Sequence, residues 1–451
     1  MTSAWSQQPQ GTTGASQRVV VEILEGTTVQ ATPSVAGAEP TAGQRMRAVL
    51  RGRHGILRFD DVLLSKHLLF LGGIGTGKTN AMMQLLVSLR RQADPEDVFI
   101  IFDSKRDFLD ELYQDGDAVI TNQPEGGPGT VIWNLFTDIV GGGPEGASDE
   151  IYEVASTIFS EGLSAAGDNM FFAAGARDVF AAVFEALTRD GALHDNRDLR
   201  QSLEGSTKQL WDLITGHPDL KGTAQYLAGT GNTAQAVRAF LQQAVNTAFS
   251  GVFRLPGDFS IRQFVRDKGR RALFVEYDIA AGSRLMPVYR VLLDLAIKEA
   301  LTMGRDRKPG SVYFVMDEFS LVPQLQHMTD GINFGRSLGL KFIVGTQNVE
   351  QVLFSYGPEL GRTILSGFGT VLGFRLMDDV SRNFVRQRFG SNRKRLTLDA
   401  AVRAQGVQQE TLLGNVIEDW HMSALGVGEC IASFPTGDPF QFAFDEYRRP
   451  A

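Results

Sequence analysis

Residues 72–79 read Gly-Gly-Ile-Gly-Thr-Gly-Lys-Thr and directly follow the apolar run Leu68–Leu71. Residues 80–91 then place apolar side chains at helical spacing, so the motif joins a short buried strand to a helix. Glycines in this pattern let backbone N–H groups surround a triphosphate, and the helix adds its positive N-terminal end. The sequence therefore predicts a P-loop that binds ATP. Its residues are Gly72, Gly73, Ile74, Gly75, Thr76, Gly77, Lys78 and Thr79, with Lys78 at the β and γ phosphates and Thr79 at Mg²⁺.

A second acidic motif ends another apolar strand, where residues 311–319 read Ser-Val-Tyr-Phe-Val-Met-Asp-Glu-Phe. This is the pattern of a Walker B strand. We expect Asp317 to hold Mg²⁺ and Glu318 to polarise the attacking water. Because both carboxylates are present, the pair predicts hydrolysis rather than binding alone. A metal hydrolase is disfavoured, since the six histidines show no ligand spacing.

The two motifs are far apart, because Asp317 lies 239 positions after Lys78. Residues 141–144, Gly-Gly-Gly-Pro, break the chain, and helical apolar spacing follows them. The predicted helices span 149–159, 169–187, 199–213 and 233–249. We therefore expect an inserted all-α domain over residues 144–260.

The remaining apolar runs predict the strands of the α/β part. They span 68–71, 98–102, 118–120, 272–277, 312–316, 342–345 and 370–374. Continuous apolar strands separated by helices indicate a mostly parallel sheet covered on both faces, with ligands at the carboxyl ends of its strands. Asp103, Asp317, Glu318 and Gln347 all follow such ends. The predicted fold class is α/β, a RecA-like P-loop domain of residues 51–143 and 261–451 with the helical insertion. Residues 1–50 form an N-terminal segment, with a strand at 18–24 and a linker at 27–42.

Composition sets few further limits. The net charge is −8, and one cysteine, Cys430, excludes an internal disulfide. No apolar run approaches a membrane span, and the first residues lack a signal-peptide core, so a soluble cytoplasmic chain is expected. Positive charge clusters in two segments that a ring could present to DNA, although such clusters are more often solvated helix faces. The clusters are Arg45, Arg47, Arg51, Arg53 and Arg58, and Arg382, Arg386, Arg388, Arg393, Lys394 and Arg395.

Together the P-loop, residues 99–108 (Phe-Ile-Ile-Phe-Asp-Ser-Lys-Arg-Asp-Phe) and residues 315–319 resemble the type IV coupling proteins. These are conjugation ATPases of the TraD/TraG class, related to the FtsK/HerA translocases. Residues 133–136 (Trp-Asn-Leu-Phe), 259–264 (Phe-Ser-Ile-Arg-Gln-Phe) and 334–348 extend the resemblance from about residue 53 to 444.

The resemblance implies a RecA-like domain with an all-α insertion, assembled as a homo-hexamer whose channel passes DNA. By position, it implies that Gln347 senses the γ-phosphate and that Arg336 is an arginine finger reaching a neighbour's nucleotide. Arg362 is the substitute candidate for the finger.

This chain departs from the family pattern in two places. The family's second-strand motif reads Asp-Pro-Lys-Gly-Glu, whereas residues 103–107 read Asp-Ser-Lys-Arg-Asp, which puts the local turn and any role for Asp107 in doubt. Membrane-anchored members also carry two N-terminal transmembrane helices that are not seen here. Membrane contact would then be peripheral, through partners.

Two functions remain open. The first is a Mg²⁺-ATP-dependent hexameric motor that translocates or delivers DNA, or a DNA–protein substrate, with relaxosome or secretion-channel proteins as possible partners. The second is a nucleotide-gated recruitment module that docks partners through the helical insertion and moves no strand. Glu318, Arg336 and Gln347 favour the motor, whereas the absent membrane anchor and the net negative charge favour the recruiter.

Overall fold

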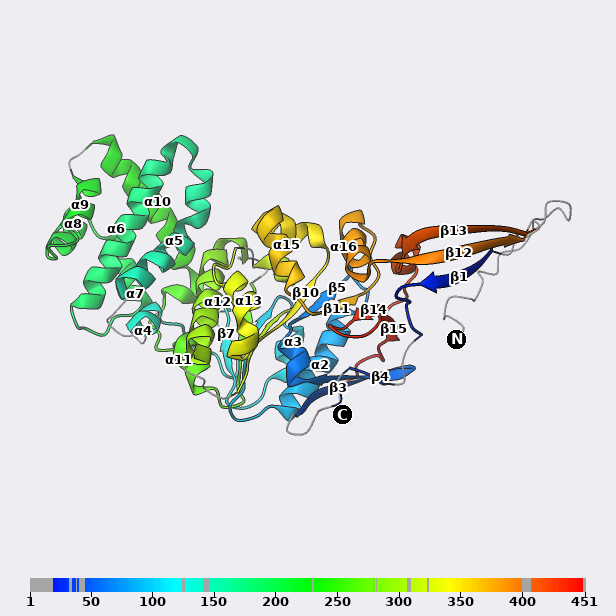
Figure 1. Cartoon of the computed structure of the whole chain (residues 1–451). Coiled ribbons are helices and arrows are strands. Elements are labelled where there is room, and N and C mark those ends of the chain that lie inside the picture. Colours follow the sequence, from blue (N-terminus) through cyan, green and yellow to red (C-terminus); the bar gives the residue numbers. More distant parts are fainter. Residues whose placement is uncertain are drawn as a thin grey trace.

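The computed structural model describes residues 19–31, 35–37, 39, 45–123, 126–140, 147–228, 231–278, 280, 282–305, 310–322, 324–399 and 407–448. Three parts follow one another along the molecule: a helical part at one end, an α/β body in the middle and a narrow β-sheet arm at the other end (Figure 1). The two motifs of the predicted site belong to the body.

The body is built on a nine-stranded sheet. Its order is β15 (Phe440–Ala443), β14 (Glu429–Ser433), β11 (Thr370–Gly373), β5 (Leu68–Leu71), β10 (Leu340–Thr346), β9 (Val312–Met316), β6 (Val98–Asp103), β8 (Ala272–Glu276) and β7 (Ala118–Ile120). The seven strands from β11 to β7 are parallel, and β14 and β15 extend the sheet in antiparallel fashion. All seven predicted strands are confirmed, with ends that shift by two residues at most. The predicted α/β class with a mostly parallel sheet is confirmed as well.

Helices cover both faces of this sheet. One face packs against α2 (Lys78–Gln92) and α3 (Asp107–Leu112), and the other packs against α12 (Gly282–Arg305) and α13 (Met328–Leu338). Alternate residues of each strand enter the two separate cores: in β6, Ile101 belongs to the first and Phe102 to the second. Every residue of these parallel strands is buried, which is why the sequence shows them as continuous apolar runs.

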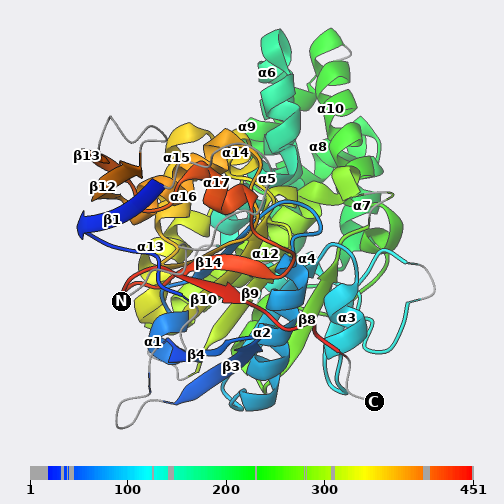
Figure 2. The same cartoon turned by 90° about the vertical axis from the view of Figure 1, so that its right-hand side faces the viewer.

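The described part of residues 147–260 contains helices and loops but no strand. Its elements are α5 (Ala147–Ala165), α6 (Met170–Arg189), α7 (Asn196–Glu204), α8 (Thr207–Thr215), α9 (Lys221–Ala224) and α10 (Asn232–Ala248), framed by α4 (Leu135–Val140) and α11 (Ile261–Asp267). Figure 2 shows α6 and α10 extending beyond the body. The domain boundaries themselves remain a prediction.

One predicted helix was wrong. Residues 199–213 do not form a single helix, because the chain breaks at Gly205 and restarts as α8. Ser206 caps the new helix: its hydroxyl accepts from the Gln209 backbone N–H, while the Gln209 side chain accepts from the Ser206 N–H. This reciprocal capping box makes a new start more favourable than continuation through glycine.

The arm is a three-stranded antiparallel sheet of β1 (Val19–Glu25), β12 (Ser391–Asp399) and β13 (Val407–Asn415). The predicted N-terminal strand is thus confirmed as β1 over its described residues, and its partner is near the other end of the sequence. A second small sheet joins β2 (Val35–Ala36), β3 (Met46–Gly52) and β4 (Gly55–Asp60). Strand β3 runs across residue 50, where the first domain boundary was predicted, and β2 lies inside the predicted linker, the rest of which lies partly outside the described residues.

Short helices complete the body. They are α1 (Asp61–Leu64), α14 (Val349–Tyr356), α15 (Pro358–Ser366), α16 (Asp379–Phe389) and α17 (Asp419–Ser423). No helix in the described ranges is long and apolar enough to cross a membrane.

Candidate nucleotide site

The glycine loop leaves β5 and enters α2 through backbone conformations that require glycine. Gly75 and Gly77 have φ of 69° and 104°, in the left-handed region that side chains disfavour. A Cβ at Gly72 would lie 2.6 Å from the Cβ of Phe374, and one at Gly77 would lie 2.8 Å from the Gly428 nitrogen. The loop is therefore closely packed on its outer side, and its glycines fit the predicted phosphate-binding role.

Lys78 and Thr79 form the first turn of α2, where the helix dipole is positive. The Lys78 ammonium folds back over the loop and donates to the carbonyl oxygens of Gly72 and, at 3.1 Å, Gly73. Burial lowers the pKa of Lys78, and the nearby Glu318 carboxylate opposes that shift. The cation and the Walker B acids therefore lie in one electrostatic neighbourhood.

Asp317 ends β9 as a buried carboxylate. Its two oxygens accept from the Ser104 backbone N–H at 3.1 Å and from the Ser104 hydroxyl at 2.5 Å. Burial is the main cause that raises its pKa to about 7, and the charges of Asp103 and Glu318 contribute to the same rise. A buried cluster of like charges favours binding of a cation. Asp317 therefore fits a Mg²⁺ ligand together with Thr79.

Glu318 follows Asp317 and is also buried. Its Oε1 accepts from the Ser320 hydroxyl at 2.6 Å. Strand β10 lies between β5 and β9, so Gln347, one residue beyond the end of β10, lies between the P-loop and the Walker B acids. The Gly72 N–H donates to the Thr346 carbonyl at 3.2 Å, which joins the loop to this strand end.

Asp103 has a structural part in the site. It accepts from the backbone N–H groups of Phe108 and Leu109 at 3.0 and 2.8 Å, and so holds the start of α3. Burial raises its pKa to about 6. Arg106 stands where the family motif has glycine and keeps a left-handed backbone, with φ of 65°. The backbone at residue 106 is thus left-handed although the residue is not glycine.

Arg336 does not lie at its own chain's site. Arg336 is exposed near the end of α13 and precedes β10, whereas Gln347 follows the same strand. Strand β10 has seven residues and is roughly 20 Å long. The side chains of Arg336 and Gln347 therefore start from opposite ends of this strand. Arg362 is exposed on α15. The structure thus brings together the P-loop, Asp317, Glu318 and Gln347, whereas Arg336 lies at the other end of β10.

Comparison with known proteins identifies the family of the chain. Residues 53–409 match the family model described as the type IV secretion-system coupling protein DNA-binding domain. The chain belongs to this coupling-protein family. No curated protein matches the chain at a significant level.

Solved structures share the fold of this coupling protein. The unbound bacterial conjugative coupling protein TrwBΔN70 is 18% identical, with a TM-score of 0.73 over 97% of this chain and 96% of that one. TrwB in complex with ADP and Mg²⁺ has a TM-score of 0.71 at 18% identity and covers 98% of each chain. VirB4 of Thermoanaerobacter pseudethanolicus is more distant, with 14% identity and a TM-score of 0.52 over 91% of this chain and 99% of that one.

Several groups that support the P-loop were missed in the sequence. The Arg375 carbonyl accepts from the Gly73 N–H at 3.1 Å, and the Gly428 N–H donates to the Thr76 carbonyl at 2.9 Å. Farther along α2, Asn80 and Gln84 donate to the Asp445 carbonyl. These contacts use main-chain atoms distant in sequence, so no local motif marks them. Ser104 was visible only as the residue that replaces the family's proline.

The basic clusters of this coupling protein are largely paired. Arg47 is buried and bonds Asp61 at 2.8 Å and Asp97 at 3.1 Å. In the second cluster most partners are acids: Asp379 for Arg382, Asp419 for Arg386, Glu25 for Arg393, Glu418 for Lys394 and Glu22 for Arg395. Arg388 instead donates to the Gly369 carbonyl. These clusters therefore give little support to a DNA track.

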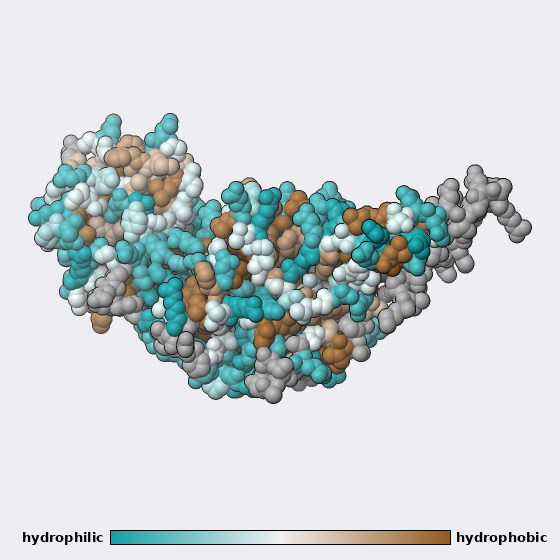
Figure 3. Space-filling model, in the orientation of Figure 1, coloured by the Kyte–Doolittle hydropathy of each residue, from teal (hydrophilic) through white to brown (hydrophobic). Residues whose placement is uncertain are grey.

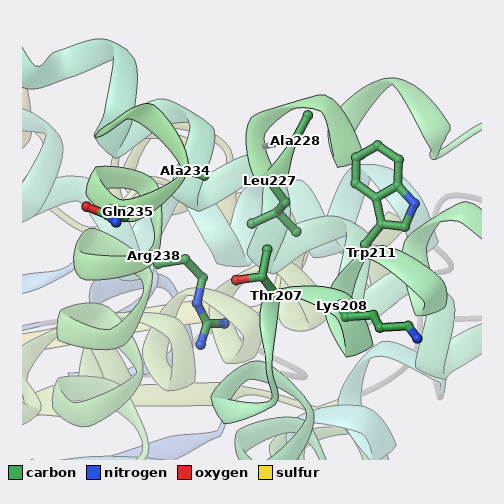
Figure 4. A pocket seen from close by; sticks show the side chains of 8 residues that line it. All are labelled: Thr207, Lys208, Trp211, Leu227, Ala228, Ala234, Gln235 and Arg238. Atoms are coloured by element: carbon green, nitrogen blue, oxygen red, sulfur yellow. The ribbon is translucent and has the colours of Figure 1, made fainter. Parts of the chain in front are cut away.

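A groove of about 760 Å³ lies in the helical part, between α8, α10 and the turn after α9 (Figure 4). Its lining is Thr207, Lys208, Trp211, Leu227, Ala228, Ala234, Gln235 and Arg238. The Arg238 guanidinium donates to the Leu203 carbonyl at 3.3 Å, and burial lowers its pKa. Among the described residues, no carboxylate forms an ion pair with Lys208 or Arg238. The groove thus combines an apolar floor with two cationic side chains.

Among the described residues, no three or more His, Cys, Asp or Glu side chains are grouped so that they could hold a metal ion.

Proposed function

We propose that this chain is a Mg²⁺-dependent ATPase that assembles into a ring, as a homo-hexamer, and moves or delivers DNA, or a DNA–protein substrate, in a conjugation-type system. The observation that carries the proposal is the meeting of Lys78, Asp317 and Glu318 at neighbouring strand ends, with Gln347 between them. The family model, described by DNA binding, supports the substrate class. TrwB has been solved with ADP and Mg²⁺ and with a non-hydrolysable ATP analogue, which supports the ligands.

In this mechanism the loop N–H groups of residues 72–77 and the Lys78 ammonium hold the phosphates. Asp317 and Thr79 hold Mg²⁺, which neutralises developing charge on the phosphoryl oxygens when bound. Glu318 accepts a proton from the attacking water, and the Ser320 hydroxyl orients its carboxylate. Gln347 contacts the γ-phosphate from the end of β10.

Arg336 acts in this proposal on the site of a neighbouring subunit. Arg336 is exposed, and it lies at the amino-terminal end of β10, whereas the P-loop of its own chain lies at the carboxyl ends of the strands. Both observations support action in trans. Mixing experiments test this directly. Rings mixed from inactive Lys78→Ala and inactive Arg336→Ala subunits contain some interfaces with both wild-type groups. Recovery of turnover on mixing supports the trans role, whereas activity that stays at the level of either variant overturns it. The same mixture with Arg362→Ala tests the substitute.

Steady-state ATP turnover tests the motor itself. It is measured with and without single- and double-stranded DNA across a salt series, beside Glu318→Gln. We expect DNA to stimulate turnover, salt to weaken that stimulation, and Glu318→Gln to bind ATP while hydrolysing it roughly 10²- to 10⁴-fold more slowly. Normal turnover in Glu318→Gln would remove its assigned role.

The groove favours a second candidate function, a nucleotide-gated recruitment module. Its apolar floor and its two cations, which form no ion pair with a described carboxylate, suit an acidic protein segment, such as one on a relaxosome or channel partner. Two results together would favour this function over the motor. The rate of ATP turnover would not change when DNA is added. Partner binding would be lost in Arg238→Glu but kept in Arg197→Glu, a control at an exposed position. In either function we place the chain in the cytoplasm, with any membrane contact made through partners.

A further inference from the structure

A short segment connects the proposed water-activating glutamate to the inserted helices. Its described residues are 319–322 and 324–327, and we call them the connecting segment. At its start, the Phe319 ring stacks on Tyr356 with centroids 5.2 Å apart and planes at 17°. The Tyr356 hydroxyl donates to the Val322 carbonyl at 3.1 Å. Tyr356 is the last residue of α14, which begins two residues after Gln347. The residue that follows Glu318 and the last residue of the helix that follows Gln347 are therefore stacked on each other.

The far end of the connecting segment is held by α12. The backbone N–H groups of Gln326 and His327 each donate to one oxygen of Asp294, both at 3.1 Å. Asp294 is buried. A bidentate carboxylate fixes the direction of this end of the segment, because both oxygens have a defined donor.

Two side chains at the same end reach α5, a helix of the insertion. The Gln326 amide donates to the Thr157 hydroxyl at 2.8 Å, and the His327 ring bonds the Glu153 carboxylate. Lys298 of α12 donates to the same carboxylate at 2.6 Å. Burial raises the pKa of Glu153, but the bonds from His327 and Lys298 outweigh it and bring the pKa to about 2, so the carboxylate stays charged. Six sequence positions, 320–325, thus lie between the packed Phe319 and Gln326, whose side chain is hydrogen-bonded to α5.

We infer that Gln326 and His327 are positioning residues for ATP hydrolysis: through the connecting segment they fix Glu318 relative to α5, so the inserted helices set how well Glu318 activates water. This rests on the proposed function, in which Glu318 is the base. Neither residue touches the nucleotide in this account. Their effect passes through packed contacts that two elements of the site share, which gives the coupling a physical path.

Kinetics of Gln326→Ala, Thr157→Val and the double variant test the inference. We expect each single variant to lower kcat about 10-fold with the KM for ATP unchanged, because binding groups are intact while the base is displaced. The double variant should lower kcat no further than either single one, since both remove the same bond. Thr188→Val is the matched control: among the described residues the Thr188 hydroxyl bonds the Phe184 carbonyl of its own helix, as the Thr157 hydroxyl also bonds the Glu153 carbonyl, but it makes no bond to the connecting segment. Equal kcat in wild type and all variants, with melting temperatures unchanged, would overturn the inference.

Hydrogen exchange separates this inference from the proposed function. In wild type, a non-hydrolysable ATP analogue should change exchange in residues 153–160 of α5, and in Thr157→Val that response should be lost although the analogue still binds. If the analogue fails to bind wild type, the proposed function fails. If it binds, and α5 does not respond in wild type, the coupling is refuted while the nucleotide site stands. Should Gln326→Ala fail to fold, Thr157→Val carries the test from the other side of the bond.

Discussion

The sheet of the body and the sheet of the arm differ in what covers them. All residues of β5, β6 and β9 are buried, with helices on both faces. In the arm, Val21 is 52% exposed and Leu413 is 74% exposed, and Figure 3 shows apolar side chains at the surface at this end. Register places Val21 opposite Leu396, so one face of the arm carries apolar side chains from both β1 and β12, interrupted by Lys394 opposite Ile23. Burial on two faces makes a sheet rigid enough to hold a site, whereas the arm depends on its own ladder and cross-strand pairs.

The largest expected effect lies in the body. Phe102 is buried in β6 with its ring edge-on to Tyr277 and Tyr289. Phe102→Ala removes these contacts and leaves a cavity, so we expect a loss of about 3–5 kcal/mol in the free energy of unfolding. Chemical denaturation measures it. Phe354→Ala, at a side chain that is 91% exposed, is the control and should lose little. Comparable losses in both variants would break the contrast between covered and uncovered side chains.

The next effect concerns the site that the body holds. Lys78→Ala removes the cation at the P-loop, and we expect ATP affinity to fall roughly 10- to 100-fold, from the loss of charge-assisted hydrogen bonds. Isothermal titration at fixed Mg²⁺ measures the affinity. Arg91→Ala, at an exposed position on the same helix, should bind ATP as wild type does. If Lys78→Ala and Arg91→Ala bind ATP with equal affinity, the nucleotide site does not lie at the P-loop.

Asp317→Asn gives a smaller effect with a defined pH dependence. The folded-state pKa of about 7 lies above the ordinary value of 3.8, so folding favours the protonated form. That contribution is fully present below pH 4 and is lost as pH rises through 7. Without nucleotide or Mg²⁺, the variant should therefore unfold at a higher temperature than wild type above pH 7, by roughly a few degrees, and at the same temperature near pH 4.

The Mg²⁺ affinity of the wild type should follow the same titration, because only the ionised carboxylate binds the ion. It should fall as pH drops from 8 to 6. If the difference in melting temperature between Asp317→Asn and wild type does not depend on pH, burial of the Asp317 charge is not the cause of that difference.

The smallest effect is expected in the arm. Leu396→Ala should change the free energy of unfolding by less than about 1 kcal/mol and leave ATP turnover unchanged, because its side chain is only half-buried. Denaturation of this variant beside Phe102→Ala sharpens the comparison. A loss as large as that of Phe102→Ala would mean that the arm is covered in solution.

Burial also explains what the sequence could predict. The parallel strands appear as unbroken apolar runs, and the P-loop and Walker B motifs each sit at the end of such a run. Strand β12 was hidden, since Arg393, Lys394 and Arg395 read as a basic cluster until Glu25 and Glu22 are seen opposite them. Those pairs join residues more than 360 positions apart, which local patterns cannot show.

Other differences came from signals of two kinds. The capping box of Ser206 and Gln209 is visible in the sequence and could have divided the helix predicted over 199–213. The bonds to Gly73 and Thr76 use backbone atoms of Arg375 and Gly428, which have no residue signature. Roles for Gln347, Arg336 and Arg362 depend on a bound nucleotide and a neighbouring subunit, so they stay predictions.

The support of the P-loop by Gly428 has a consequence for how the protein is made. The Thr76 carbonyl accepts from the Gly428 N–H, and the Gly428 carbonyl in turn accepts from the Phe444 N–H. At about 5–20 residues per second, a ribosome needs roughly 20 to 70 s to translate the chain from Thr76 to Gly428. During that time the P-loop of the nascent chain lacks the hydrogen bond from Gly428. The protein should therefore become able to bind ATP only late in synthesis, long after the P-loop itself has left the ribosome.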